Sequence, residues 1–595
     1  MPGFIGTIGQ TIPVFNVETR PNLVQGFLQG ENYRLERRTI DKFMDDKVFV
    51  DAEDLLIVIE GVVLNKHLLI DKYSSKGDFE TCVRVMYEKL GETFFNSFRG
   101  SFSGAIFDKK AEKWLVFTDH IGDKQVFYSK LEDSLLFGSE MRFMVETLKA
   151  NKIPVTLDKT GAYLVLTHGF VIEDHTLVNE VKKLSAGHYL KYDGNGLQEI
   201  QYHRFSNCPQ SNMTEAEAVE GIDRLFKQAV KLQFDKDLEY GYKHITTLSG
   251  GLDSRMTVWV AHQMGYVEQL NTTFSQSNYL DFTIAQQIAT DLHHEFLFKA
   301  LDHGGFVRDI DNVTPLTYGN ACFFGLAHGK SMYDAVNFEP YGIMHTGMIG
   351  DAIIGTFFRK NAYNTGVKLG QGAYSVELID RLADYKFKYE YENEEIFCLY
   401  TRAFTGANQG MVLFQEHTES VSPFCDVDFI EFCYSIPLNL RFNHKIYFDW
   451  ILQKYPEAAE YIWEKNRSKI HAFVNKEPKR INVFGHKIPA VNDKQFLIWL
   501  KAAIRRRVRS RKKYIKQQNV QTSSKESMNP IDYWYNESRD FRRFIDEYGL
   551  RWMPLLSDDG LSMDVELIFN KPSVIDKLQV LSLLSVIRIL EDQTC

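Results

Sequence analysis

The residues best suited to chemistry form one short run, Ser249-Gly250-Gly251-Leu252-Asp253-Ser254. Its two glycines can adopt backbone conformations closed to other residues and bring N–H groups close to an anion. The two serines add hydroxyl donors, and a helix that follows would direct its positive end at the same point. The run therefore predicts a phosphate cradle formed by Ser249, Gly250, Gly251 and Ser254. A glycine-rich turn without a ligand is the alternative.

Asp253 is a carboxylate inside this anion site, where it would repel phosphate unless a cation bridges the two. Mg²⁺ suits that place because it prefers oxygen ligands. A second acid follows the apolar strand expected from Gly342, which enters a turn punctuated by glycines and carrying Asp351. Asp253 and Asp351 are therefore the predicted metal ligands, and both are expected to act in catalysis.

The segments around the loop alternate between strands and helices. We expect strands over 244–248, 269–274 and 294–298, and helices over 253–264 and 281–292. Right-handed crossovers make such a βαβαβ unit part of a parallel sheet covered on both faces. Ligands of such sheets bind beyond the carboxyl ends of the strands, where the loop falls. We also assign Leu248, Phe274, Thr346 and Gly347 to nucleotide binding.

The run resembles S-G-G-x-D-S, the pyrophosphate-loop (PP-loop) signature of ATP pyrophosphatases, and no Walker-type G-x-x-x-x-G-K-[ST] occurs. Residues 342–355 resemble the asparagine synthetase segment S-G-E-G-x-D-E-x-x-G-G, with Met348 and Ala352 where that family has glutamates. Residues 422–426 resemble its R-x-P-F-L-D, and Lys445 falls where it has a lysine that holds the leaving pyrophosphate. The resemblance implies ATP and Mg²⁺ as cofactors and Lys445 as a catalytic residue. Without it, Lys445 reads equally well as a solvated surface lysine.

Residues 100–108, 118–128 and 137–140 resemble the glutamine amidotransferase domain of the class B, glutamine-hydrolysing asparagine synthetases. That family begins M-C-G-I and uses the cysteine as its nucleophile, whereas Pro2 stands here without a thiol or hydroxyl. Glu60 replaces an amide that would help to stabilise an oxyanion. The resemblance therefore implies a degenerate amidotransferase domain without glutaminase activity, like that of β-lactam synthetases and lasso-peptide cyclases.

A chain of 595 residues is too long for one hydrophobic core, so we expect two domains. Strand-like patterns dominate from 51 to 144, and a helix with a cap-like start begins at Thr214. We place the boundary near 205. Residues 1–205 are then an amidotransferase-like, Ntn-hydrolase-like β-sandwich (αββα), and residues 206–595 a Rossmann-like PP-loop ATP pyrophosphatase domain. The fold class is α/β and α+β.

The charge, cysteine content and hydropathy of the chain limit which partners and which cellular location are expected. A formal net charge of −9 argues against a dedicated nucleic-acid binder. Seven scattered cysteines suggest neither a disulfide framework nor a zinc site and fit a cytoplasmic location. We expect neither secretion nor a membrane span. The nine cations from Lys501 to Lys516 indicate a basic surface helix or a site for an acidic partner. The aromatic stripe from Tyr385 to Tyr391 is expected to pack.

These features predict an AMP-forming carbon–nitrogen ligase. A substrate carboxylate would attack the α-phosphate of ATP, pyrophosphate would leave with help from Lys445, and an amine would attack the acyl-adenylate. The substrate would be a small molecule or peptide with a carboxylate and an amine, and the product a natural product or modified metabolite. Three alternatives stay open: an ammonia-dependent asparagine synthetase-like enzyme, a catalytically retired ATP-binding protein, and a tRNA-modifying enzyme. A homo-oligomer is also left open.

Overall fold

The computed structural model describes residues 3–9, 15, 23–74, 77–359, 362–363, 366–470, 480–483, 486–489 and 527–591. Pro2 and the basic run from Lys501 to Lys516 lie outside the described residues, so the predictions made for them stay predictions. Within the described ranges, no helix has the length and apolar character needed to cross a bilayer.

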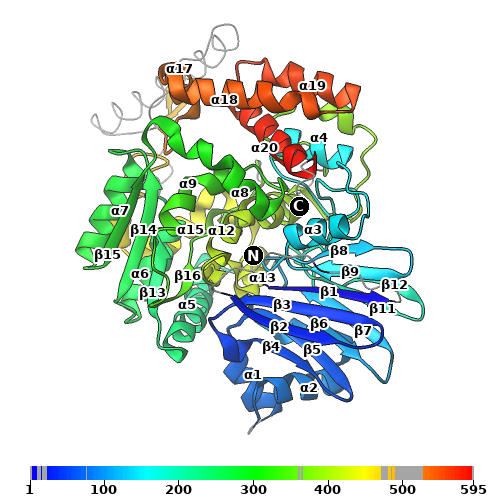
Figure 1. Cartoon of the computed structure of the whole chain (residues 1–595). Coiled ribbons are helices and arrows are strands. Elements are labelled where there is room, and N and C mark those ends of the chain that lie inside the picture. Colours follow the sequence, from blue (N-terminus) through cyan, green and yellow to red (C-terminus); the bar gives the residue numbers. More distant parts are fainter. Residues whose placement is uncertain are drawn as a thin grey trace.

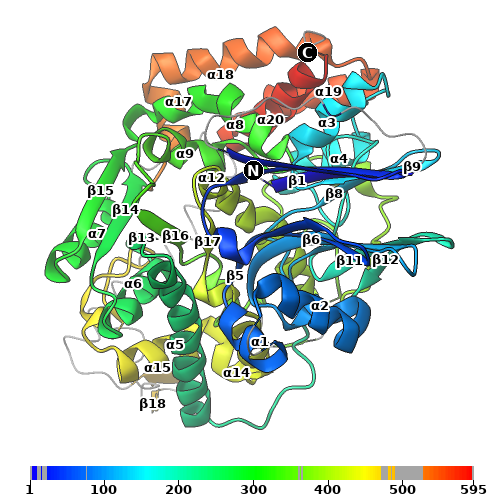
Figure 2. The same ribbon diagram turned by 60° about the horizontal axis from the view of Figure 1, so that its bottom comes forward.

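The first part of the chain builds two antiparallel six-stranded sheets (Figure 2). The first sheet has the order β10-β8-β9-β1-β3-β2, with strands Lys182–Lys183, Phe127–Lys130, Ser134–Gly138, Gly3–Gly9, Tyr33–Ile40 and Leu23–Gln29. The second has the order β12-β11-β7-β6-β5-β4, with strands Gly196–Gln201, His188–Asp193, Lys113–Thr118, Gly100–Asp108, Leu55–Val63 and Val48–Asp51.

Side-chain alternation along the strands separates the layers of this sandwich. In β5, Leu56 and Val58 join the core between the two sheets, whereas Ile57 and Ile59 pack against helix α2 (Phe79–Leu90) on the outer face. Helix α1 (Lys66–Tyr73) lies beside α2, and helix α3 (Met141–Ala150) covers the outer face of the first sheet. The layers therefore run helix, sheet, sheet, helix, as the αββα prediction requires.

The second part contains a five-stranded parallel sheet in the order β15-β14-β13-β16-β17. Its strands are Glu295–Ala300, Gln269–Ser275, Lys243–Thr247, Tyr341–His345 and Ser420–Val421. The connecting helices α6 (Asp253–Gln263) and α7 (Leu280–Asp291) confirm the predicted βαβαβ unit to within a few residues. The chain leaves central β13 toward β14 and later returns to pair β16 on its other side. The crevice at this switch of direction is where such sheets bind ligands.

Helices surround the parallel sheet. The long helix α5 (Glu215–Glu239) begins with the capping box expected at Thr214, whose hydroxyl accepts from the Glu217 N–H. Helix α4 (Lys159–His168) shares one hydrophobic core with helices near the C-terminus (Figure 1). Those helices are α17 (Ile531–Glu537), α18 (Arg539–Trp552), α19 (Asp559–Phe569) and α20 (Val574–Glu591). Residues before and after 205 are thus closely interpacked, and the division at 205 stays a prediction.

Candidate active site

The run from Ser249 to Ser254 forms the turn between β13 and α6 and is closed by its own hydroxyls. The Ser249 N–H donates to the Ser254 hydroxyl at 2.9 Å, and the Gly251 N–H donates to the Ser249 hydroxyl at 3.2 Å. The Gly250 N–H donates to the Asp281 carboxylate at 2.9 Å. Helix α6 begins without a side-chain cap on the N–H groups of its first turn.

Neither loop glycine is needed for its backbone conformation, which corrects one expectation. Neither Gly250 nor Gly251 has a positive φ, so their conformations are open to other residues. A β-carbon on Gly250 would instead lie 2.9 Å from Cβ of Glu464. Burial raises the pKa of neighbouring Asp281 to about 6, against the hydrogen bond from the Gly250 N–H. The contact with Glu464 therefore leaves no room for a side chain at Gly250.

The turn after β16 lies directly against the loop. A β-carbon on Gly347 would be 2.2 Å from the Ser254 nitrogen, and one on Gly350 would be 2.7 Å from Cγ of Asp253. Thr346 anchors this turn, because its buried hydroxyl donates to the Val421 carbonyl at 3.2 Å. Two segments almost a hundred residues apart in sequence thus meet without room for side chains between them.

The two predicted acids meet at this contact. One Asp253 oxygen accepts from the Asp351 N–H at 2.9 Å, and the other accepts from the Tyr447 hydroxyl at 2.8 Å. Burial raises the pKa of Asp253 above its usual range, and the nearby charge of Asp351 raises it further. The Asp351 side chain is itself 57% exposed. This acid pair carries unfavourable negative charge that a cation would relieve.

One cavity of about 510 Å³ opens above these elements. It is lined by most of the predicted site residues: Leu248, Ser249, Gly251, Asp253, Ser254, Phe274, Thr346, Gly347 and Asp351. Away from the loop its wall is apolar and aromatic, with Tyr333, Leu413 and Phe414 among its residues. The structure therefore brings the predicted positions together, while their roles in binding stay predictions.

Lys445 is not among the residues that line the cavity. Its Nζ pairs with the carboxylates of Glu215 and Asp449, the latter at 3.0 Å. Lys465 lines the cavity instead, with its Nζ 4.0 Å from an Asp351 oxygen. Lys465 follows Trp463 and Glu464, which also line the cavity, in a stretch without regular helix or strand. No periodicity or glycine pattern marks that stretch, so sequence reasoning had no means of finding Lys465.

Arg255 holds this stretch against the loop. Its buried guanidinium donates to the carbonyls of Gly250 at 3.1 Å, Ala458 at 3.1 Å and Ile462 at 2.7 Å. Burial lowers the pKa of Arg255 to about 10, against the attraction of the Tyr447 and Tyr461 hydroxyls. One side chain thus ties the loop to the segment that carries Lys465. Sequence reasoning missed it, although Arg255 directly follows the six-residue run.

In the sandwich, Glu60 lies at a buried position near the end of β5, where it is 2% exposed. Burial raises the pKa of Glu60, against the charges of Lys47 and Arg37. Asp119 forms the centre of a tight buried turn, accepting from the N–H groups of Ile121 at 3.1 Å and Lys124 at 2.8 Å. The segments that carried the amidotransferase resemblance are therefore well-packed parts of this fold.

Residues 47–203 match the family model described as a glutamine amidotransferase domain. A putative asparagine synthetase [glutamine-hydrolyzing] 2 of Methanocaldococcus jannaschii is 27% identical over 272 residues, which is 44% of this chain and 51% of that protein. An asparagine synthetase [glutamine-hydrolyzing] 2 of Bacillus subtilis is 27% identical over 269 residues, covering 41% and 34%. The chain is asparagine synthetase-like.

This asparagine synthetase-like chain spans about half or less of the length of the curated relatives it matches. The asparagine synthetase B of Escherichia coli is 22% identical over 280 residues, covering 43% of this chain and 44% of that protein. A solved structure titled as the allosteric regulatory enzyme of purine biosynthesis covers 50% of this chain and 74% of that chain at 9% identity. Its TM-score of 0.23 is too low to support an argument.

Proposed function

We propose that this chain is an ATP-dependent ligase that adenylates a substrate carboxylate, releases pyrophosphate and joins the acyl group to an amine. The observation that carries the proposal is the meeting of Asp253 and Asp351 at the turn between β13 and α6, where the Asp351 N–H donates to the Asp253 carboxylate. The names of the relatives, which are asparagine synthetases, support a ligase that forms amide bonds.

In the proposed reaction, a carboxylate oxygen of the substrate attacks the α-phosphorus of ATP. The bond from that phosphorus to the bridging oxygen of pyrophosphate breaks, leaving an acyl-adenylate. An amine nitrogen then attacks the acyl carbon, AMP departs with the carbon–oxygen electron pair, and the new amide loses one proton. Because the cavity holds both partners next to each other, positioning supplies a large part of the acceleration.

The acid pair fits a divalent cation. Asp253 has a raised pKa because it is buried beside another acid, and its cost falls when a cation shares the site. Asp253 and Asp351 would hold Mg²⁺, which when bound neutralises charge on the phosphate oxygens. The exposed carboxylate of Asp351 faces the cavity from the turn after β16, so it can change partners as the nucleotide enters.

Lys465 takes the role that the resemblance implied for Lys445. The Lys465 ammonium lines the cavity near Asp351 and can stabilise charge that accumulates on the leaving pyrophosphate. Lys445 is already neutralised by Glu215 and Asp449. We therefore expect Lys465→Met to lower turnover by about 100-fold or more, as loss of one transition-state contact does, and Lys445→Met to have little effect.

The chain acts without glutamine in this proposal. Glu60 puts a buried acid where the related domain has an amide donor, so an oxyanion would be repelled there. The amine is then part of the acyl substrate, a second substrate or free ammonia. The product is a peptide, a small-molecule natural product or a modified metabolite.

The proposal is tested by ATP–pyrophosphate exchange across a panel of carboxylates, with AMP and ADP separated by chromatography. Carboxylate-dependent exchange and AMP formation are expected, with no glutamate released from glutamine. Turnover that yields only ADP, or Mg·ATP binding without any exchange, would contradict it. Lys465→Met and Lys445→Met are compared in the same assay, and the reverse order of effects would refute the assignment of Lys465.

A further inference from the structure

A second cavity lies between the sandwich and the segment that follows residue 388. Its volume is about 100 Å³. Side chains from both parts of the chain line it, among them Lys183, Ser185, His188, Arg204, Tyr389 and Phe404. It has no residue in common with the lining of the nucleotide cavity, so it is a separate site.

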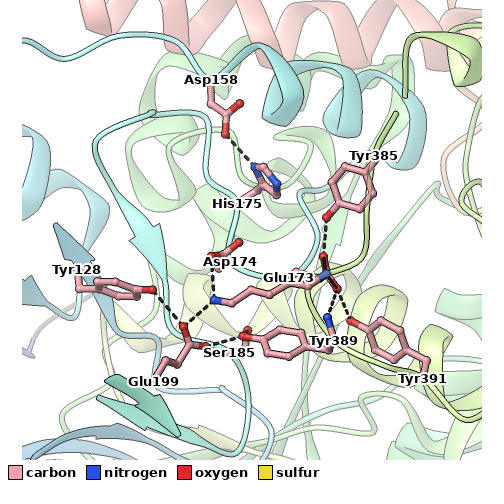
Figure 3. Close-up of polar contacts among 11 residues, drawn as sticks. Tyr128, Asp158, Glu173, Asp174, His175, Ser185, Glu199, Tyr385, Tyr389 and Tyr391 are labelled. Atoms are coloured by element: carbon pink, nitrogen blue, oxygen red, sulfur yellow. Dashed lines mark hydrogen bonds and ion pairs between the residues drawn. The ribbon is translucent and has the colours of Figure 1, made fainter. Parts of the chain in front are cut away.

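Hydrogen bonds fix the wall of this cavity in place (Figure 3). The Glu173 carboxylate accepts from the hydroxyls of Tyr385 at 2.7 Å and Tyr391 at 3.1 Å, and from the Lys388 N–H at 3.0 Å. The Tyr389 hydroxyl donates to Glu199 and lies 2.9 Å from the Ser185 hydroxyl. The aromatic stripe from Tyr385 to Tyr391 thus packs as predicted, and its polar ends are also bonded. Glu173, one of the two acids that line the cavity, already accepts from several donors.

Lys183 is the unusual member of the wall. Its side chain is 4% exposed, yet among the described residues no oxygen lies within hydrogen-bonding or ion-pairing distance of its Nζ. The buried lysines Lys47 and Lys124 differ, because Glu419 lies 3.5 Å and 2.7 Å from their ammonium groups. Burial lowers the pKa of Lys183 to about 8, against the attraction of Asp119 and Asp123. A buried ammonium without a direct ion pair is unfavourable, and an anion bound against it would relieve that cost.

Of the other basic side chains in the wall, neutral His188 has no donor left for a ligand, whereas Arg204 carries a charge. Nδ1 of His188 lies 2.9 Å from the Ala186 carbonyl and donates to it. Arg204 adds a second positive charge at the more exposed side, where its side chain is 39% exposed, donates to the Glu390 carbonyl and lies 4.0 Å from the Glu392 carboxylate. The wall of the cavity therefore carries two cations, Lys183 and Arg204, and two acids, Glu173 and Glu390. The oxygens of Glu173 already accept from several donors.

We propose that this cavity binds a small oxyanion, a carboxylate or a phosphate ion, through the ammonium of Lys183. The volume of about 100 Å³ is enough for an anion of this size. Such an anion would join β10, which carries Lys183, to the helical run that contains Phe404. That run continues to Gly410 and Leu413, which line the nucleotide cavity, so the anion would brace one wall of that cavity from the sandwich side.

The test is thermal unfolding of the full chain titrated separately with sodium phosphate and sodium acetate, with sodium chloride keeping the ionic strength constant. The wild type is expected to show a saturable rise in Tm with at least one of the two. In Lys183→Met the apparent Kd for the anion that stabilises the wild type should be at least ~10-fold higher than in the wild type, because one charge-assisted hydrogen bond is lost. The same variant should have a higher Tm than the wild type in chloride alone, since an unpaired buried charge is gone.

Two variants serve as controls. Lys182→Met changes the neighbouring residue of β10, whose side chain points to the opposite face, and should keep the response. Ser254→Ala alters the phosphate loop and should keep it as well. A response that survives Lys183→Met but is lost in Ser254→Ala would overturn the proposal, as would the absence of a saturable response in the wild type. Lys183→Gln repeats the comparison if the Met variant does not fold.

Discussion

The contact between the phosphate loop and the turn after β16 leaves no room for a methyl group at Gly347. A β-carbon there would lie 2.2 Å from the Ser254 nitrogen and 2.5 Å from the Asp253 carbonyl carbon, both backbone atoms. Reaching ordinary contact at 3.4 Å requires a movement of 3.4 − 2.2 = 1.2 Å. Gly347 has no positive φ, so Gly347→Ala introduces this clash without backbone strain of its own.

The expected cost follows from overpacking a well-packed contact, about 1–3 kcal/mol. If the turn moves away in the free protein, the cost appears when Mg·ATP draws the two segments together. The affinity for Mg·ATP should then fall by about 5- to 150-fold, at 1.4 kcal/mol for each factor of ten. If the turn cannot move, the same amount appears as a lower free energy of unfolding. Calorimetric titration with Mg·ATP and urea unfolding together measure both parts.

Gly325→Ala is the matched control. Gly325 lines the same cavity, but a β-carbon there would have no atom within 4 Å. It should therefore leave both the Mg·ATP affinity and the free energy of unfolding near the wild-type values. Our reasoning about Gly347 would be refuted if Gly347→Ala changed neither quantity, or if the two variants lost affinity to the same extent.

Two further predictions concern groups beneath the loop. Arg255→Met should lower the free energy of unfolding in urea by about 2–4 kcal/mol, because the carbonyls of Gly250, Ala458 and Ile462 lose a charged donor, and Arg255→Lys should not restore it. A small effect of Arg255→Met would contradict the conclusion that Arg255 ties the loop to the segment 458–462. Asp281 has a pKa raised to about 6 by burial, above its usual value of 3.8, so its contribution to stability is present below pH 3.8 and is lost as the pH rises through 6. Asp281→Asn keeps the acceptor for the Gly250 N–H but cannot ionise. It should remove up to about 3 kcal/mol of the decline in stability between pH 4 and 6. Equal profiles of stability against pH for the wild type and the variant would argue against this role of Asp281.

Local patterns were enough to predict the parallel sheet and the loop. The strands β13, β14 and β15 and the helices between them are marked by apolar periodicity, and their order alone puts Ser249 to Ser254 at the ligand-binding edge. The glycines around Asp351 marked the second turn. The two turns can be in direct contact because Gly347 and Gly350 have no β-carbon. The sequence alone does not show which atoms approach a glycine.

Charged residues were harder to place, because what a charge does depends on its partners. Lys445 and Lys465 look alike in the sequence, yet one is paired with Glu215 and Asp449 and the other lines the nucleotide cavity. Lys183 lies in a short strand with no pattern to indicate that its ammonium makes no direct ion pair among the described residues. Such contacts come from long-range packing, which composition and periodicity do not record.

The geometry of the loop explains why a carboxylate and an uncompensated arginine occur side by side there. Asp253 points into the cavity, where its charge is tolerable only with a cation, and Arg255, two residues later on α6, is buried on the side of the segment 458–462. Because Asp253 is an acid next to the expected phosphates, positive charge is needed there. Arg255 holds the segment that brings Lys465 there, while its own charge is spread over backbone carbonyls and does not neutralise the acid pair. Both residues lie in the first turn of one helix, so binding chemistry and placement of the distant lysine are set by the same short stretch of chain.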